Sequence, residues 1–308
     1  MQRFLNKLDE WQRRRPIASF IFAVIKKSGD DQLGYQAALI TYYGFLALFP
    51  LLLIATTVLQ IVLRSDRHLE AQVLNSINQY LPLIGGDLKS NIQGFHRSGL
   101  ALIVGALLTF YGARGVAVAL QNALNHLWGV PRFKRPGFPK NVLKSFGLII
   151  FGGGGFILAS VLSSAAASLG RSFVFTGASI LISLIILFGT FLFIFRFGTV
   201  SAAARRSHNF IGALGAAIGL QVLQTGGGFL LAHEIKHLGV LYGTFAVVLG
   251  LLFWLYLQVQ VVLYSVEIAT VHNLKLVPRS LTGNRPTDGD ERVQKLATAR
   301  GQLQKSRK

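Results

Sequence analysis

The sequence contains no cysteine and little charge. Without cysteine the chain forms no disulfide, no thiolate nucleophile and no cysteine-bound zinc or iron–sulfur site. Only 14% of its 308 residues are charged and 52% are hydrophobic, whereas about a quarter of the residues of a soluble domain are charged. The sequence also lacks a Gly-rich phosphate loop, a Walker-type motif and a recognisable base beside its Ser and Thr residues. These absences argue against a soluble catalyst and against transport driven directly by ATP.

Six long apolar stretches predict six transmembrane helices, because about 20 apolar residues cross a hydrocarbon core of about 30 Å. The sequence therefore predicts an all-α polytopic membrane protein. A short apolar run after Pro16 is too short to span and predicts an interfacial helix, not a signal peptide. The predicted regions are an interfacial segment (1–36), a membrane domain (37–272, with spans at about 37–63, 100–120, 142–169, 173–197, 210–231 and 240–268) and a basic tail (273–308) that we expect to be disordered.

The positions of the cationic residues predict the orientation of the chain. Of the 31 Lys and Arg residues, 25 lie in the N-terminal segment, in residues 114–144 around the second connection, in residues 196–206 around the fourth connection, and in the tail. Because cytoplasmic connections carry an excess of Lys and Arg, both termini are predicted to be cytoplasmic. Membrane insertion thus explains the net charge of +19 without nucleic-acid binding. We expect anionic lipid headgroups as partners of the basic connections and tail; a homo-oligomer is left open.

The longest outer connection, residues 64–99, carries a second helical pattern. Its apolar residues Leu69, Val73, Ile77 and Tyr80 recur at helical spacing before Pro82. The pattern predicts an amphipathic helix in an outer loop, lying on the membrane or capping a cavity.

Arg114 lies fifteen residues into the second apolar stretch. An Arg near the bilayer centre costs about 2.5–3.5 kcal/mol on insertion scales, so it should face a partner or a wet cavity. The alternative is that the side chain extends one to two turns to the cytoplasmic headgroups.

Polar residues of the sixth span form a second candidate site. Tyr256, Gln260, Tyr264 and Glu267 are separated by steps of four, four and three, which puts them on one helical face. Glu267 is the only acid in a predicted span, and we expect it to pair with Arg114. The alternative is that Glu267 lies at the interface and that these residues only join helices.

Further residues of the spans are weaker candidates for the same interior. They are Tyr42 and Pro50 of the first span, with Pro50 predicted to kink the helix, and Gln221 and Gln224 of the fifth. Two glycine runs, residues 152–155 and 226–228, indicate close helix packing more than a helix break.

One motif is typical of zinc hydrolases. His233, Glu234 and His237 read H-E-x-x-H, in which two histidines four apart on a helix bind Zn²⁺ and the Glu acts as a base. Here the motif falls in a predicted short outer connection, and no third ligand occurs between residues 237 and 267. We therefore expect an exposed connector, no metal and no cofactor, and keep a zinc hydrolase as the less favoured alternative.

Three groups of short motifs, taken together, resemble the YihY/virulence factor BrkB family. They are AALITYY and FPLL at residues 37–43 and 49–52; ARGV, ALN and WGVP at residues 113–116, 123–125 and 128–131; and YGTFA and LFWLY at residues 242–246 and 252–256, ending at Glu267. The resemblance implies six spans in the bacterial cytoplasmic (inner) membrane and adds Asn125 to the site candidates. The family's former label, ribonuclease BN, is regarded as mistaken, and no carboxylate pair here supports nuclease chemistry.

The functional expectation is a non-enzymatic membrane protein that transports or handles a lipid or another envelope amphiphile. In this hypothesis Arg114 meets an anionic headgroup or Glu267, and the outer helix caps the path. The alternative is a scaffold that transports nothing and whose polar residues only pack.

Overall fold

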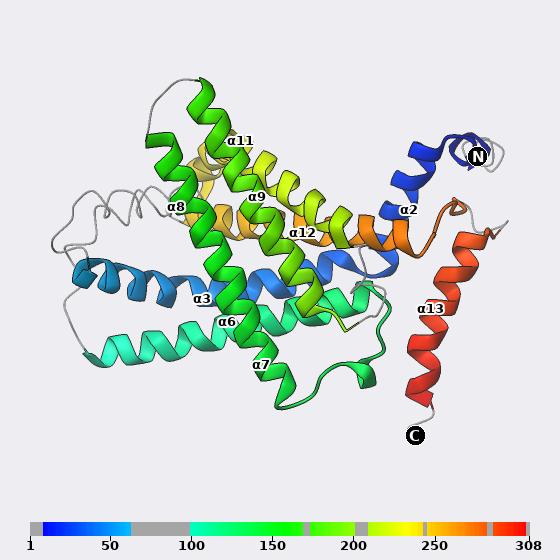
Figure 1. The fold of residues 1–308 in the computed structure, drawn as a ribbon, viewed down its shortest axis with the longest axis horizontal. Coiled ribbons are helices and arrows are strands. Elements are labelled where there is room, and N and C mark those ends of the chain that lie inside the picture. Colours follow the sequence, from blue (N-terminus) through cyan, green and yellow to red (C-terminus); the bar gives the residue numbers. More distant parts are fainter. Residues whose placement is uncertain are drawn as a thin grey trace.

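The computed structural model describes residues 9–62, 99–168, 173–200, 209–242, 245–281 and 286–305, and all the regular structure within them is helical. The long helices are α2 (Pro16–Asp30), α3 (Leu33–Val62), α6 (Gly99–Leu127), α8 (Gly154–Ser168), α9 (Phe173–Gly198), α11 (Asn209–Tyr242), α12 (Phe245–Asn273) and α13 (Asp288–Lys305) (Figure 1). The short helix α7 (Lys140–Gly147) continues into α8 through a π-helical segment, Leu148–Gly153, and a 3-10 turn covers Arg132–Lys134. The predicted all-α class is confirmed for the described residues.

Five of the described segments are long and apolar enough to cross a membrane: Ile103–Leu127, Lys140–Leu162, Thr176–Gly198, Asn209–Gly227 and Val248–Asn273. The predicted first span lies in α3, whose backbone stays helical through residue 50 but whose side chains are described only as far as Leu48. The predicted amphipathic helix of the outer loop and the side chain of Pro50 lie outside the described residues.

The helices pack in a chain of neighbours (Figure 1). Helix α3 lies against α6 and α12, α12 also packs against α11, and α9 lies between α11 and α8. Trp254, Phe191 and Phe195 are the largest apolar side chains of the core. Many Ile, Leu and Phe side chains of α6, α8 and α9 point outward, as expected where the surroundings are hydrocarbon.

Close contacts between helices depend on glycine. A Cβ at Gly112 of α6 would lie 2.6 Å from the Cβ of Ala47, and a Cβ at Gly227 of α11 would overlap the ring of Trp254. In the run of four glycines at residues 152–155, the need for glycine differs between neighbours. A Cβ at Gly155 would overlap Thr190, whereas a Cβ at Gly154 would meet no atom within 4 Å. The structure therefore favours close packing as the role of Gly227 and Gly155.

The N-terminal helix α2 is present as predicted and packs on α12 and α3. Its outward face carries Ile17, Ile21 and Ile25, which are 75%, 53% and 57% exposed. Its inward face carries Ser19, Ala23, Val24 and Lys27, all buried. An apolar outer face is what a helix in the membrane interface requires.

The prediction of a disordered tail is wrong over residues 276–281 and 286–305. Leu276 is buried with Ala23, Val24 and Val271, and Val277, Val293 and Leu296 pack against this group. Thr287 precedes α13 as its N-cap, and its main-chain N–H donates to the Asp290 carboxylate at 3.2 Å, as in a capping box. A few apolar residues and one cap thus order a segment whose average composition is polar.

Adjacent glycines provide a test of close packing. Gly155→Ala should destabilise the protein by about 1–3 kcal/mol, because the added methyl overlaps Thr190. Thr190 cannot rotate away freely, since its hydroxyl donates to the Ile186 carbonyl at 2.8 Å. The control Gly154→Ala should be neutral or stabilising by up to about 1 kcal/mol. Thermal unfolding in detergent checks both variants, and equal melting temperatures would contradict this packing.

Candidate functional site

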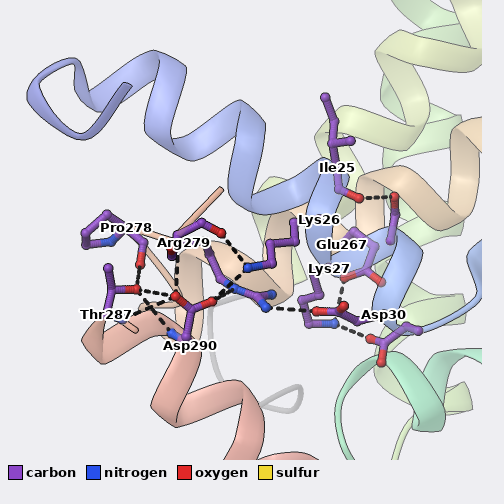
Figure 2. Close-up of polar contacts among 12 residues, drawn as sticks. Ile25, Lys26, Lys27, Asp30, Glu267, Pro278, Arg279, Thr287 and Asp290 are labelled. Atoms are coloured by element: carbon purple, nitrogen blue, oxygen red, sulfur yellow. Dashed lines mark hydrogen bonds and ion pairs between the residues drawn. The ribbon is translucent and has the colours of Figure 1, made fainter. Parts of the chain in front are cut away.

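The ammonium group of Lys27 lies at a junction of three helices (Figure 2). It donates to Asp31 Oδ2 at 2.5 Å and to Glu267 Oε2 at 2.7 Å. It also donates to the main-chain carbonyl of Leu127 at 3.1 Å. The hydroxyl of Thr270 lies 3.0 Å from the same Glu267 oxygen. Lys27, Asp31, Glu267 and Thr270 are called the Lys27 cluster below.

Local structure explains how these groups meet. Lys27 and Asp31 are four residues apart, so they share one face at the end of α2. Leu127 is the last residue of α6, where main-chain carbonyls have no partner within the helix. A cation at this negative end of a helix dipole is favourable. The cluster therefore joins the end of α2 to the C-terminal ends of α6 and α12.

The cluster is buried. The side chains of Lys27, Asp31 and Glu267 are 2%, 6% and 0% exposed. The ammonium of Lys27 faces two carboxylates, and His126 Nε2 lies 3.8 Å from Asp31 Oδ1. Burying ions costs several kcal/mol each unless geometry and hydrogen bonds compensate. Such a group in a membrane protein is a functional candidate by default.

The predicted pair of Arg114 with Glu267 is wrong. Glu267 is paired with Lys27, a residue that sequence analysis placed in the interfacial segment. Arg114 is exposed, and no described residue forms an ion pair or hydrogen bond with it. It lies thirteen residues before Leu127, about 20 Å along α6 from the cluster. Lys27 of α2 therefore contacts the Glu267 carboxylate, whereas Arg114 of α6 lies too far along its helix to do so.

Asn125 lies close to the cluster, but its side chain forms hydrogen bonds that link two helices (called the Asn125 tie below). Its side chain is 1% exposed. Its amide donates to the Gly198 carbonyl at 3.1 Å, and its carbonyl oxygen accepts from the Val200 N–H at 2.9 Å. These bonds attach α6 to the end of α9.

The other predicted candidates do not join the Lys27 cluster. Tyr42 is 56% exposed on α3. Tyr256, Gln260 and Tyr264 are half-buried along α12, and Gln221 and Gln224 are half-buried on α11. The amide groups of Gln221 and Gln224 contain buried atoms that no described residue reaches with a hydrogen bond. A role for these residues in a substrate path stays a prediction.

The H-E-x-x-H motif does not lie in a connector. Helix α11 continues to Tyr242, so the backbone of residues 233–237 is helical and places His233 and His237 on one face. The side chains of these residues lie outside the described part. The expectation of a short connector outside a long helix is thus wrong, because the apolar residues after Lys236 extend the fifth helix.

A second polar cluster lies next to the first, outside the apolar spans (Figure 2). Arg279 forms ion pairs with Asp30 at 2.9 Å and Asp290 at 2.8 Å. Lys26 donates to Asp290 at 3.1 Å and to the Ser280 carbonyl at 2.5 Å. This group, called the tail clasp below, attaches the C-terminal tail to α2. Two neighbouring lysines therefore serve two different clusters.

Asp290 is the centre of the tail clasp. Burial acts to raise the pKa of Asp290, but hydrogen bonds from Arg279, the Ser280 N–H, Thr287 and Lys26 outweigh it and hold this pKa well below its usual range. The carboxylate is therefore ionised at every physiological pH and keeps the clasp closed.

Comparison with known proteins identifies relatives without a stated activity. A family model described as virulence factor BrkB matches residues 24–289. A UPF0761 membrane protein of Chromohalobacter salexigens is 27% identical over 241 residues, covering 76% of this chain and 58% of that protein. UPF0761 membrane proteins of Ralstonia nicotianae and Vibrio campbellii are 25% and 23% identical, covering 87% and 81% of this chain and 61% and 81% of those proteins.

The chain thus spans about six tenths of the length of the first two of these relatives. No solved structure matches this chain.

The tie made by Asn125 predicts a large loss of stability. Asn125→Ala should cost about 1–3 kcal/mol for each main-chain group left unpaired, the Gly198 carbonyl and the Val200 N–H. Asn122→Ala removes an exposed contact with Arg135 and should stay within about 0.5 kcal/mol of the wild type. Thermal unfolding in detergent compares the two, and a harmless Asn125→Ala would disprove the tie.

The tail clasp predicts a defined response to pH. Because the pKa of Asp290 is lowered on folding, its stabilisation is complete above the ordinary Asp pKa of about 3.9 and is lost as the pH falls through the lowered value. Amide exchange in α13, corrected for intrinsic rates, should therefore be constant from neutral pH to about pH 4.

Asp290→Asn should accelerate this exchange roughly ten- to hundredfold at neutral pH, since hydrogen bonds to a charged group contribute about 1.5–3 kcal/mol. The exposed neighbour Glu291 offers the matched control Glu291→Gln, which should leave exchange unchanged. Equal exchange in the two variants would rule out the clasp.

Proposed function

The chain belongs to the BrkB virulence factor family and is a membrane protein with several apolar helices, and on this premise we propose that it transports an anionic lipid or amphiphile across the bacterial cytoplasmic membrane. The observation that carries the proposal is the exposure of Arg114 in the middle of the apolar segment Ile103–Leu127. Its predicted acidic partner, Glu267, is occupied by Lys27.

A cation at this depth requires an anion from outside the described protein. An Arg at the centre of a spanning helix costs about 2.5–3.5 kcal/mol on insertion scales. A phosphate or carboxylate headgroup offsets this cost, because the planar guanidinium donates two parallel hydrogen bonds to such groups. Attraction of a headgroup to this depth is the central requirement of lipid translocation.

The surroundings of Arg114 suit an amphiphile. Ile103, Leu107 and Tyr111 are 64%, 65% and 61% exposed, and steps of four residues put them on one face of α6. Arg114 continues this face after a step of three. An acyl chain lying along the apolar side chains would bring its headgroup to the guanidinium.

The proposal includes a topology. Helix α3, with 30 residues, would supply the sixth span. The excess of Lys and Arg in alternate connections would place both termini in the cytoplasm. The Lys27 cluster and the tail clasp would then lie at the cytoplasmic end. Arg132, Lys134 and Lys140 are exposed beside Phe138, which is 88% exposed, so this connection would bind anionic headgroups.

A lipid translocation assay tests the proposal. Protein in vesicles is given a fluorescent anionic or zwitterionic phospholipid, and the label that changes leaflet is measured by quenching from outside. The wild type should translocate the anionic lipid. Arg114→Ala should be roughly ten- to hundredfold slower, since it removes a charged hydrogen bond of about 1.5–3 kcal/mol. The control Arg14→Ala, which removes an exposed Arg outside the apolar spans, should keep the wild-type rate.

The scaffold alternative predicts other results. If wild-type protein moves no lipid under conditions in which it remains folded, the transport proposal fails. If Arg114→Ala translocates as fast as Arg14→Ala, the guanidinium extends to the headgroups and is not part of a path.

A further inference from the structure

Helix α3 carries a row of exposed side chains that includes two tyrosines. Steps of four, three and four residues put the row on one face of the helix. On a spanning helix, a face that points away from the protein core meets lipid. The members of the row, all exposed, are Tyr35, Leu39, Tyr42 and Leu46.

Glycine contacts fix how α3 lies against α6. A Cβ at Gly115 of α6 would overlap the ring of Tyr43, and a Cβ at Gly112 would lie 2.6 Å from the Cβ of Ala47. The residue numbers of the contacts rise along α3 and fall along α6. The two helices are therefore antiparallel neighbours (Figure 1).

The residues just before these four contact positions lie on one side of the helix pair. One residue turns a helix by about 100°, and in two facing helices that run in opposite directions this turn leads to the same side. The residues are Tyr42 and Leu46 on α3 and Tyr111 and Arg114 on α6, and all four are exposed. Leu48, one residue past a contact position, is buried on the opposite side. The faces of Tyr42 and Arg114 thus form one lipid-facing surface.

Ring contacts bring Tyr42 to the segment of α6 that contains Arg114. The rings of Tyr42 and Tyr43 meet edge to face, with their centroids 5.5 Å apart. The Tyr43 ring fills the space over Gly115, the residue after Arg114. The Tyr42 hydroxyl has no hydrogen-bond partner among the described residues. In hydrocarbon such a hydroxyl is costly unless it meets a polar group.

The two helices offer hydrogen-bond donors and no carboxylate. Neither α3 nor α6 contains Asp or Glu. Arg114 supplies a positive charge and N–H donors, and the phenol of Tyr42 supplies an O–H donor. These groups match a phosphate, whose oxygens accept hydrogen bonds. An ammonium group would instead meet the charge of Arg114 with no carboxylate to balance it.

We infer that Tyr42 is a second headgroup ligand, and that the shared surface of α3 and α6 binds the phosphate of an anionic lipid that has no ammonium group. The phosphate lies between the Arg114 guanidinium and the Tyr42 hydroxyl, and the acyl chains lie along Leu46 and Tyr111. The inference rests on the proposed role of Arg114 and adds the class of lipid and a ligand from a second helix.

Photolabelling of the full-length chain locates and measures this binding. The probe is a phosphatidylglycerol with a photoactivatable acyl chain, added to protein in phosphatidylcholine vesicles, and mass spectrometry maps the labelled peptides. The wild type should be labelled on both α3 and α6. Unlabelled phosphatidylglycerol should compete with the probe, whereas additional phosphatidylcholine should not.

Tyr42→Phe is the sharpest variant, because it removes only the hydroxyl. It should weaken binding at these peptides roughly three- to tenfold, the loss expected for one hydrogen bond. The matched control Tyr43→Phe removes the hydroxyl of a half-buried ring between the helices and should bind like the wild type. In an Arg114→Ala background, Tyr42→Phe should have a smaller effect, since the two residues hold one headgroup.

Equal binding by Tyr42→Phe and Tyr43→Phe would overturn the inference, as would equal competition by the two lipids. The readout is separate from translocation. Vesicles that bind the probe as expected but move no lipid would support this site and contradict the transport proposal alone. Slow translocation by Arg114→Ala with unchanged binding by Tyr42→Phe would contradict the second ligand alone.

Discussion

The contact between Lys27 and Glu267 is the interaction on which the rest of this end of the molecule depends. It joins residues 240 positions apart at 2.7 Å and attaches α2 to the last helix of the membrane domain. The same ammonium holds the end of α6 through the Leu127 carbonyl. A buried ion pair of this kind contributes little net stability relative to apolar packing, but removing one partner costs about 3–5 kcal/mol. The pair therefore specifies where α2 lies more than it strengthens the fold.

Two consequences follow from the position of α2. Lys26, the neighbour of Lys27, points to the other side and binds Asp290, so one helix connects the buried cluster to the C-terminal tail. Helix α2 also supplies the cation for Glu267, which leaves Arg114 exposed on α6 without a partner among the described residues. The proposal for a headgroup at Arg114 depends on this division of the two cations.

Sequence alone predicted the all-α class, α2 and the helices of five predicted spans, because helical length and hydropathy are local properties. Helices α6 and α11 nevertheless continue past the predicted ends, to Leu127 and Tyr242. It also singled out Glu267 as the one acid in a span. It missed Lys27, because basic residues before a first span usually face lipid headgroups. One signal was present: Ser19, Ala23 and Lys27 recur every four residues opposite Ile17, Ile21 and Ile25, which marks Lys27 as inward. The order of the tail was missed, since it depends on contacts between α2 and residues 276–296.

The most direct test of the account is a double-mutant cycle between Lys27 and Glu267. Unfolding free energies are measured in detergent for the wild type, Lys27→Met, Glu267→Gln and the double variant. The structure predicts a coupling free energy of about 1–3 kcal/mol, with the double variant less destabilised than the sum of the single variants. Additivity within about 0.5 kcal/mol would show that the two side chains do not meet, and the Lys27 cluster would have to be abandoned.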